Sequence, residues 1–202
     1  MSDLLVIKEI KQLYKKGNSA AEIGKKLGYS WRKIIYLMQK HNIKRRSHSE
    51  ATYRKLNPNG HPFKIKDNLT RAEQELRALG LGLFLGEGAK SNSLSVRLSN
   101  SDPALINVFL NFLKNICGVK AGKIKLWLTL HSDMPQIKAE EFWALRLNTP
   151  LPDFKKHVIL NHGNNGSGRK KSAYGTATVC VHNMKLRGIL DNWVNDSVKR
   201  HS

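Results

Sequence analysis

The stretch ALGLGLFLGEGAK, residues 78–90, restricts the fold of this chain more than any other part of the sequence. Thr70 and Glu73 form the pattern of a capping box, which predicts a helix that begins at Arg71 and runs into this stretch. Three glycines lie inside the predicted helix, and each costs about 1 kcal/mol relative to alanine. Glu87 adds a carboxylate at the negative end of the helix dipole. A helix with both penalties needs a contact or a function that compensates for them.

Small residues recur every four positions along this predicted helix, so they share one face. Small residues at this spacing allow a second helix to approach closely, as they do between membrane helices. Because the stretch has no second copy in the sequence, the expected partner is the same helix of another chain across a two-fold axis. The predicted homodimer interface includes Ala78, Gly82, Leu83 and Gly86. The stripe assigned to the chain's own core consists of Leu76, Leu79 and Leu83.

The net charge of +20 on 202 residues indicates a polyanionic partner, and nucleic acid is the first candidate. The excess is shared along the chain, because residues 1–60 contain 14 of the 35 basic and 4 of the 15 acidic side chains. Two separately basic halves favour an extended partner. A charge that only improves solubility, or bulk contact with RNA, is the alternative interpretation.

The number of cysteines and the hydropathy of the sequence indicate in which cellular compartment the protein is expected. Cys117 and Cys180 are the only cysteines, which is too few for a disulfide framework. The N-terminus is amphipathic and charged, unlike a signal peptide, and the longest apolar run is far below the roughly 20 residues that span a bilayer. These features predict a soluble intracellular protein, in the cytoplasm, the nucleoid or an organelle. They predict no membrane partner and no small-molecule cofactor.

Residues 1–47 have the spacing of a helix-turn-helix DNA-binding domain. A capping-box pattern at Ser19 predicts a helix that stops at Gly28, and a further helix follows. The small residue Gly24, the glycine four positions later and the aliphatic Ile34 match the helix-turn-helix pattern. The second helix of such a pair enters the major groove. The expected DNA contacts are Ser30, Trp31, Arg32, Lys33, Tyr36, Lys40, Arg45 and Arg46.

An alternative for residues 1–47 is a helical hairpin that contacts another protein, but the basic and polar outer face favours DNA. Residues 48–69 are predicted to be a linker, because Pro58, Gly60 and Pro62 lie close together and periodicity is weak. A short helix around residues 49–56 is expected within it.

Residues 70–202 are predicted to form an α+β domain with an antiparallel sheet. In SLSVRLS, Leu94, Val96 and Leu98 alternate with polar residues, and KIKLWLTLH alternates in the same way. Two later strands, KKHVILN and GTATVCVHN, flank a loop rich in glycine and lysine. One face of the sheet would therefore be apolar and the other basic, in the shape of a saddle. An ordinary half-exposed sheet is the alternative.

The basic face and the loop supply the remaining predicted DNA contacts. On the strands they are Arg97, Lys123, Lys125, Trp127, Thr129, His131, Thr176 and Thr178. On the loop they are Arg169, Lys170 and Lys171. Lysine, arginine, threonine and histidine in this number suit phosphates and base edges. Asp102 and Pro103, in contrast, have the pattern of a helix cap and a first-turn proline.

The nine residues GLGLFLGEG, 80–88, resemble the motif of the LAGLIDADG homing endonucleases. The residues at its third, fourth, seventh, eighth and ninth positions are Gly82, Leu83, Gly86, Glu87 and Gly88. Gly80 and Leu85 depart from its first and sixth positions. The resemblance covers roughly residues 70–198, and it implies a LAGLIDADG-type domain with a DNA-binding antiparallel β-saddle after the helix-turn-helix domain.

The resemblance also implies a site and its chemistry. In that family the motif helix forms the dimer interface, and the acid at the eighth position binds the catalytic divalent metal. That role falls to Glu87, with the backbone carbonyl of Gly86 or Gly88 as a further ligand and Mg²⁺ as the expected cofactor. Family members also place a basic residue near the attacking water. The sequence leaves four candidates for it: Lys90, Lys125, Lys171 and His182.

The leading interpretation is a homodimeric, metal-dependent, site-specific DNA endonuclease that hydrolyses phosphodiester bonds in double-stranded DNA. The resemblance implies a long, partly palindromic target that is cut to leave short 3′ overhangs. The main alternative is a non-cleaving, sequence-specific transcriptional regulator of the same fold, since regulators with a helix-turn-helix domain occur in this family. An RNA-binding protein, such as a splicing helper, is a third class. Fold alone does not distinguish these functions.

Overall fold

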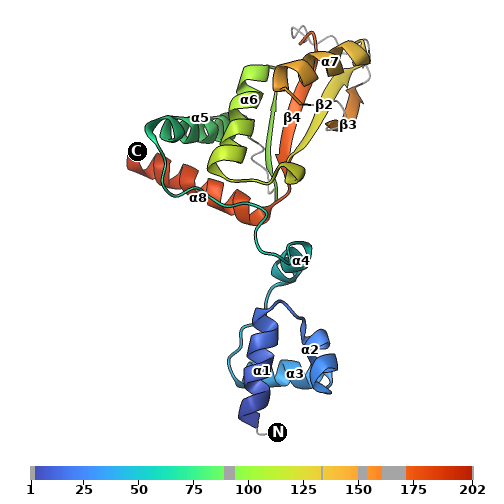
Figure 1. Cartoon of the computed structure of the whole chain (residues 1–202), viewed down its shortest axis with the longest axis vertical. Helices are drawn as coiled ribbons and strands as arrows, with labels where there is room; N and C mark the ends of the chain where they lie inside the picture. Colours follow the sequence, from blue (N-terminus) through green and yellow to red (C-terminus); the bar gives the residue numbers. More distant parts are fainter. Residues whose placement is uncertain (1–2, 89–93, 133, 150–153, 161–171, 202) are drawn as a thin grey trace. The chain divides into compact units, whose positions relative to one another are not determined.

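The computed structural model describes residues 3–88, 94–132, 134–149, 154–160 and 172–201 (Figure 1). The contacts divide the chain into two compact units, Met1–His61 and Pro62–Ser202. Each unit has a hydrophobic core of its own. Residues 62–69, which fall inside the predicted linker, pack with the second unit: Phe63 is buried in its core, and the Lys66 amide donates to the Ile116 carbonyl over 2.9 Å.

Four helices make up the described part of the first unit. They are α1 (Asp3–Lys15), α2 (Ala20–Leu27), α3 (Trp31–Lys40) and α4 (His48–Leu56). The short helix expected in the predicted linker is α4. Helices α1, α2 and α3 of this unit enclose a small core, which consists of Val6, Ile7, Ile10, Ile23, Ile34, Leu37 and Met38.

Local signals in the first unit are confirmed. The Ser19 hydroxyl accepts from the Glu22 amide over 3.2 Å, and the Glu22 carboxylate accepts from the Ser19 amide over 2.7 Å. After α2 the chain turns at Gly28, whose φ is 73°. A Cβ on Gly24 would lie 2.5 Å from the Tyr29 carbonyl oxygen, so the turn between α2 and α3 requires a glycine there.

The second unit is α+β, as predicted. Its helices are α5 (Arg71–Glu87), α6 (Pro103–Asn111), α7 (Gln136–Leu147) and α8 (Met184–His201). A π-helical segment, Phe112–Ile116, continues α6, and a 3₁₀ turn, Ala121–Lys123, precedes the second strand. The strands are β1 (Val96–Asn100), β2 (Lys125–His131), β3 (Phe154–Leu160) and β4 (Thr176–Val181).

The sheet is mixed rather than antiparallel, so that part of the predicted fold was wrong. Its order is β1-β4-β2-β3, and β4 pairs antiparallel with both β1 and β2. β2 and β3 pair in parallel, with Leu128 opposite His157. The physical reason is α7, which connects the two strands and returns the chain to the end where β2 began.

All the helices of this unit contribute to one core on one face of the sheet. Its strand residues are Val96, Leu98, Leu126, Leu128, Leu130, Ala177, Val179 and Val181. α6 and α7 cross this face (Figure 1), and Trp143 of α7 is fully buried, with its indole nitrogen 2.7 Å from the Tyr174 carbonyl oxygen. Leu94, predicted to share this core, is 67% exposed, because the strand begins only at Val96.

The buried face of α5 differs from the predicted stripe. Gly80, Leu81 and Phe84 are buried, whereas Leu79 is 59% exposed. One residue corresponds to about 100° of rotation about a helix axis, so a core face centred on Gly80 and Phe84 excludes Leu79. Leu76 and Leu83 do pack against the core, as predicted.

The described residues bear on two sequence-based expectations, which concern membrane-spanning helices and the state of the cysteines. No helix among them is long and apolar enough to cross a bilayer. Cys117 and Cys180 are both free thiols in buried positions. Burial raises the pKa of the Cys117 thiol to about 12, so this group stays protonated at neutral pH.

Candidate nucleic-acid interface and metal site

The glycines of α5 serve two different surfaces. A Cβ on Gly80 would lie 2.2 Å from Cγ of Phe112, so this glycine lets α5 pack closely on the π-helical segment of its own chain. A Cβ on Gly82 or Gly86 would meet nothing within 4 Å. Together with exposed Ala78 these two glycines form the open face of α5, which no other residue that the structure describes covers. Of the predicted interface residues, only Leu83 is half-buried against its own core.

Glu87 ends α5 at the edge of the sheet. The Gly88 amide donates to the Phe84 carbonyl over 3.1 Å, and Gly88 forms an isolated antiparallel bridge to Leu98 of β1. The helix end is therefore next to the outer edge of β1. The Glu87 side chain is exposed and makes no hydrogen bond or ion pair with any residue that the structure describes.

A free carboxylate beside a backbone carbonyl fits a divalent metal in its donor chemistry. Mg²⁺ prefers hard oxygen ligands and usually retains several waters. Within the described residues no three His, Cys, Asp or Glu side chains lie close enough to hold an ion. Glu87 with the Gly86 carbonyl could therefore supply only part of a ligand set, and a second copy of the chain, the substrate or water would supply the rest.

The strand face opposite the core carries polar side chains in register, and we call it the open face of the sheet. Across β1, β4 and β2, Arg97 is opposite Cys180, which is opposite Lys125. In a second row Thr178 lies between Ser99 and Trp127. Side chains directly opposite one another on adjacent strands share a face, so these strands keep Arg97, Lys125 and Trp127 on the face away from the apolar core.

The structure separates the predicted contacts on this face by accessibility. Lys123, on the 3₁₀ turn, and Lys125 are exposed. The residues that are half-buried are Arg97, Trp127, Thr129, His131 and Thr176. Thr178 is only 3% exposed, and its hydroxyl is 2.7 Å from that of Ser99. The prediction that Thr178 contacts DNA is therefore wrong. Thr178 lies on the central strand β4, where side chains of the neighbouring strands on both sides cover it.

The candidates for the basic catalytic residue fall into two groups. Lys125 and His182 lie on the open face around Cys180, whose sulfur is 3.6 Å from Nε2 of His182. Lys90 and Lys171 lie outside the described residues, as do the loop contacts Arg169 and Lys170.

Sequence reasoning assigned Arg97 to DNA contact and missed its position relative to Glu87. The bridge from Gly88 to Leu98 makes β1 the strand next to the end of α5. Arg97 is thus one strand away from that helix end, whereas Lys125 is three strands away. Neighbouring strands are about 4.8 Å apart. The pattern SLSVRLS contains no signal for this pairing, which arises only from the tertiary structure.

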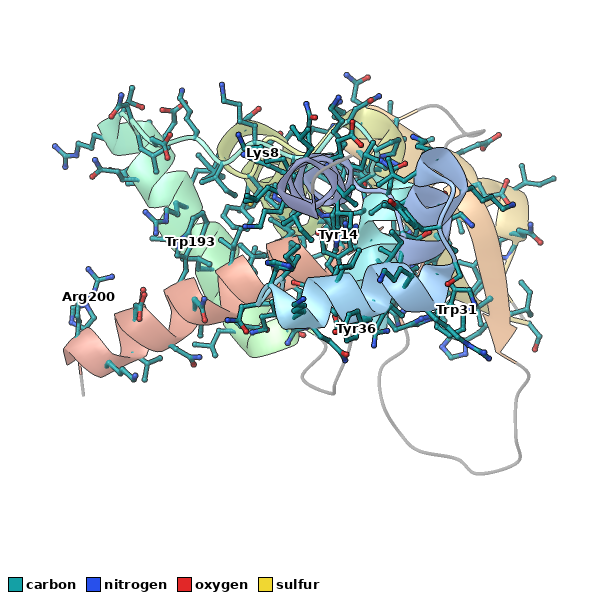
Figure 2. The ribbon with its side chains drawn as sticks, turned by 90° about the horizontal axis from the view of Figure 1, so that it is seen from below. Lys8, Tyr14, Trp31, Tyr36, Trp193 and Arg200 are labelled. Carbon is teal, nitrogen blue, oxygen red and sulfur yellow. The ribbon has the colours of Figure 1, made fainter. Side chains whose placement is uncertain are left out.

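On the first unit, α3 has an outer face that is basic and aromatic. Trp31 and Tyr36 are 52% and 54% exposed and lie on the side of α3 away from α1 (Figure 2). Arg32 is over the Trp31 ring at 5.5 Å, and Lys33 is over the Tyr36 ring at 5.6 Å. The other exposed residues of the predicted contact set are Ser30, Lys40 and Arg45.

Arg46 has a structural role that its sequence pattern does not predict. Its guanidinium donates to the carbonyl oxygens of Gly17 at 3.1 Å and Asn18 at 3.2 Å, and also to that of Tyr14. The Tyr14 ring is 3.8 Å below it. Arg46 therefore holds the loop that follows α1 against the segment that follows α3, and it stabilises the folded first unit.

The neighbours Arg45 and Arg46 give a matched test of this distinction. We expect Arg46→Gln to lower the free energy of unfolding of the first unit by about 2 kcal/mol, because three carbonyls lose a charged donor. Arg45→Gln should leave stability unchanged and reduce the salt dependence of DNA binding by about one phosphate contact. Amide hydrogen exchange in α1 and α2 measures the first effect. Equal protection in the two variants would contradict the assignment.

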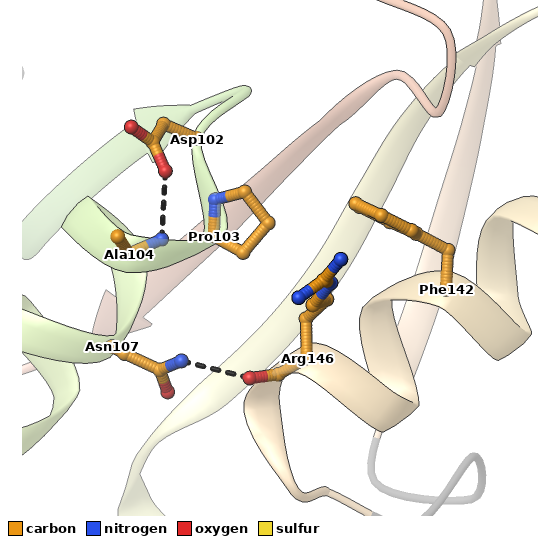
Figure 3. A pocket seen from close by; sticks show the side chains of 6 residues that line it. All are labelled: Asp102, Pro103, Ala104, Asn107, Phe142 and Arg146. Atoms are coloured by element: carbon orange, nitrogen blue, oxygen red, sulfur yellow. Dashed lines mark hydrogen bonds between the residues drawn. The ribbon is translucent and has the colours of Figure 1, made fainter.

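A shallow hollow lies between α6 and α7 on the helical side of the sheet (Figure 3). Its polar groups are committed to the fold: the Asp102 carboxylate accepts from the Ala104 amide over 2.8 Å, and the Asn107 amide nitrogen donates to the Arg146 carbonyl over 2.8 Å. Asp102 is thus a helix cap, as its sequence pattern predicts. Arg146 lies over the Phe142 ring at 5.6 Å.

Comparison with known proteins adds no relative. No protein-family model, no curated protein and no solved structure matches this chain.

Proposed function

We propose that this protein is a metal-dependent, site-specific DNA endonuclease that acts as a homodimer. One observation carries the proposal: α5 has a face of Ala78, Gly82 and Gly86 that its own chain leaves open, and the helix ends on the unpaired Glu87. Two copies crossing on this face would bring two such carboxylates together at a two-fold axis. This supports the LAGLIDADG-type arrangement implied by the motif at residues 80–88.

The charge distribution supports double-stranded DNA as the substrate. The open face of the sheet offers Arg97 and Lys125, and α3 offers Arg32 and Lys33 on a separate unit. Cations of this kind position a duplex through its phosphates, and half or more of protein–DNA hydrogen bonds are of that type. Two binding surfaces on one chain fit a long target, and two chains fit a partly palindromic one.

Each group has a role in phosphodiester hydrolysis. A divalent metal, when bound, supplies charge stabilisation and lowers the pKa of an attacking water. The Glu87 carboxylate and the Gly86 carbonyl would hold that ion at the edge of β1. Basic side chains on the open face orient the phosphate toward this edge. Attack by water on phosphorus breaks one P–O bond, and the departing oxygen takes up a proton.

Selection from random DNA tests the proposal. Duplexes that the full-length protein binds are recovered, amplified and then incubated with the protein and Mg²⁺. We expect both strands to be cut at one position in the selected site and not in unselected DNA of the same length. Selected duplexes that are bound tightly but stay intact both with Mg²⁺ and with Mn²⁺ would overturn the endonuclease proposal.

A transcriptional regulator that does not cleave is the second candidate. The observation that favours it is the first unit, whose basic and aromatic α3 face needs no metal and no second copy for DNA contact. The same selection separates the candidates, because a regulator yields a defined binding site without strand cleavage.

A further inference from the structure

Three proton-bearing side chains surround Cys180 on the open face of the sheet. Arg97 on β1 and Lys125 on β2 are its two cross-strand neighbours. His182 follows two residues later, with Nε2 at 3.6 Å from the Cys180 sulfur. Cys180 itself is fully buried. We call Arg97, Lys125 and His182 the cationic cluster.

Among the residues that the structure describes, the cationic cluster has no anionic partner. Nε of Arg97 is buried and has no hydrogen-bond acceptor. Neither Arg97 nor Lys125 forms an ion pair with an acid that the structure describes. The Trp127 ring, 5.3 Å from Cζ of Arg97, flanks the guanidinium without accepting a hydrogen bond. A buried donor without an acceptor destabilises the folded chain, so this arrangement favours a ligand that supplies acceptor oxygens.

The pKa of His182 is lowered by the same neighbouring groups. Its side chain is exposed as a whole, but partial desolvation by its neighbours lowers the pKa of the imidazole, and the positive charges of Lys125 and Arg97 lower it further. The groups that face it are Arg97 from β1, Lys125 from β2 and Cys180 from its own strand. An anion bound between them would reverse the effect of the two cations and raise the pKa of His182.

We infer that the cationic cluster binds one phosphate group, and that in the complex this is a backbone phosphate of DNA. The assignment of the phosphate to DNA rests on the proposed function. Phosphate oxygens supply the missing acceptors, and arginine recognises them through paired donors. Because β1 is the strand next to Gly88, a phosphate held by Arg97 lies on the side of the cluster toward Glu87.

Histidine NMR on the full-length protein, with inorganic phosphate as the probe, tests the inference. The His182 resonance is assigned with His182→Asn, and chloride holds the ionic strength constant. We expect phosphate, but not added chloride, to shift this resonance in a saturable way and to raise the His182 pKa. Arg97→Gln and the exposed Lys125→Gln should each weaken phosphate binding about tenfold or more. Lys138→Gln, on exposed α7 surface, removes the same charge and should leave binding within about twofold.

A His182 resonance that does not respond to phosphate would overturn the site. So would equal weakening in Lys125→Gln and Lys138→Gln, because the effect would then be one of net charge. In a second arm, a selected DNA duplex is added to the phosphate complex. Displacement of phosphate supports the DNA assignment, and an unchanged His182 shift overturns that assignment. A protein that binds phosphate here and never cuts DNA contradicts the endonuclease proposal alone.

Discussion

Glu87→Gln is expected to abolish metal-dependent cleavage while DNA binding persists. The amide keeps the size of the side chain but loses the charge that attracts a divalent ion. Loss of several kcal/mol of metal-assisted stabilisation corresponds to a rate decrease of about a thousandfold or more. Since Glu87 is exposed and unpaired, the substitution removes no contact from the folded chain. Single-turnover cleavage of the selected duplex, with binding measured separately in Ca²⁺, gives both quantities.

Glu75→Gln is the matched control, since Glu75 is an exposed carboxylate on the same helix. Its ion pair with Arg71, at 3.4 Å, is exposed on both sides and contributes little. Cleavage by this variant should stay within about twofold of the unmodified protein. A Glu87→Gln protein that still cuts at the original rate would remove Glu87 from the metal site.

Gly82→Leu is expected to convert the protein to monomers without unfolding it. A Cβ at Gly82 meets nothing in its own chain, so the fold has room for the side chain. Replacing a helical glycine should even stabilise the monomer, by about 1 kcal/mol. In the proposed dimer the same leucine would separate two helix backbones that cross at this point. Sedimentation equilibrium measures the association, and urea unfolding measures the stability of the monomer.

Gly80→Ala, on the same helix, is expected to lower stability and to leave dimerisation intact, which is the opposite of the effect of Gly82→Leu. Its Cβ would lie within 3 Å of three Phe112 side-chain atoms, so we expect a loss of about 1–3 kcal/mol of stability from overpacking. Dimerisation should persist in the molecules that fold. A Gly82→Leu protein that sediments as the unmodified protein does would rule out helix crossing at this face, and the paired carboxylates with it.

Local structure was predictable where the signal lies within a few residues. Ser19 with Glu22 and Thr70 with Glu73 both form the predicted capping boxes, because N-cap hydrogen bonds involve only neighbours along the chain. The alternation of β2 likewise placed Leu126, Leu128 and Leu130 in the core. Predictions failed where rotation or register depended on distant residues, as for Leu79 on α5 and Leu94 before β1.

For the candidate site, sequence reasoning identified Glu87 and the small-residue stripe but not their relation to other groups. Gly80 was counted with Gly82 and Gly86 as an unexplained helical glycine. Contact with Phe112, thirty-two residues later, distinguishes it from the other two. Arg46 and Thr178 have the residue types expected of DNA contacts. Three backbone carbonyls hold the guanidinium of Arg46 to its own unit, and a central strand position buries Thr178.

The sequence by itself determined the helix boundaries at the capping boxes, the division into polar and apolar faces, and the charge of the whole. Each depends on the identity or spacing of residues near one another in the chain. The tertiary structure alone decided that β2 and β3 are parallel and that the open face of α5 is free. It also decided that Arg97, Lys125 and His182 surround one buried thiol. These features depend on strand order and packing, which bring together strands that lie far apart in the sequence.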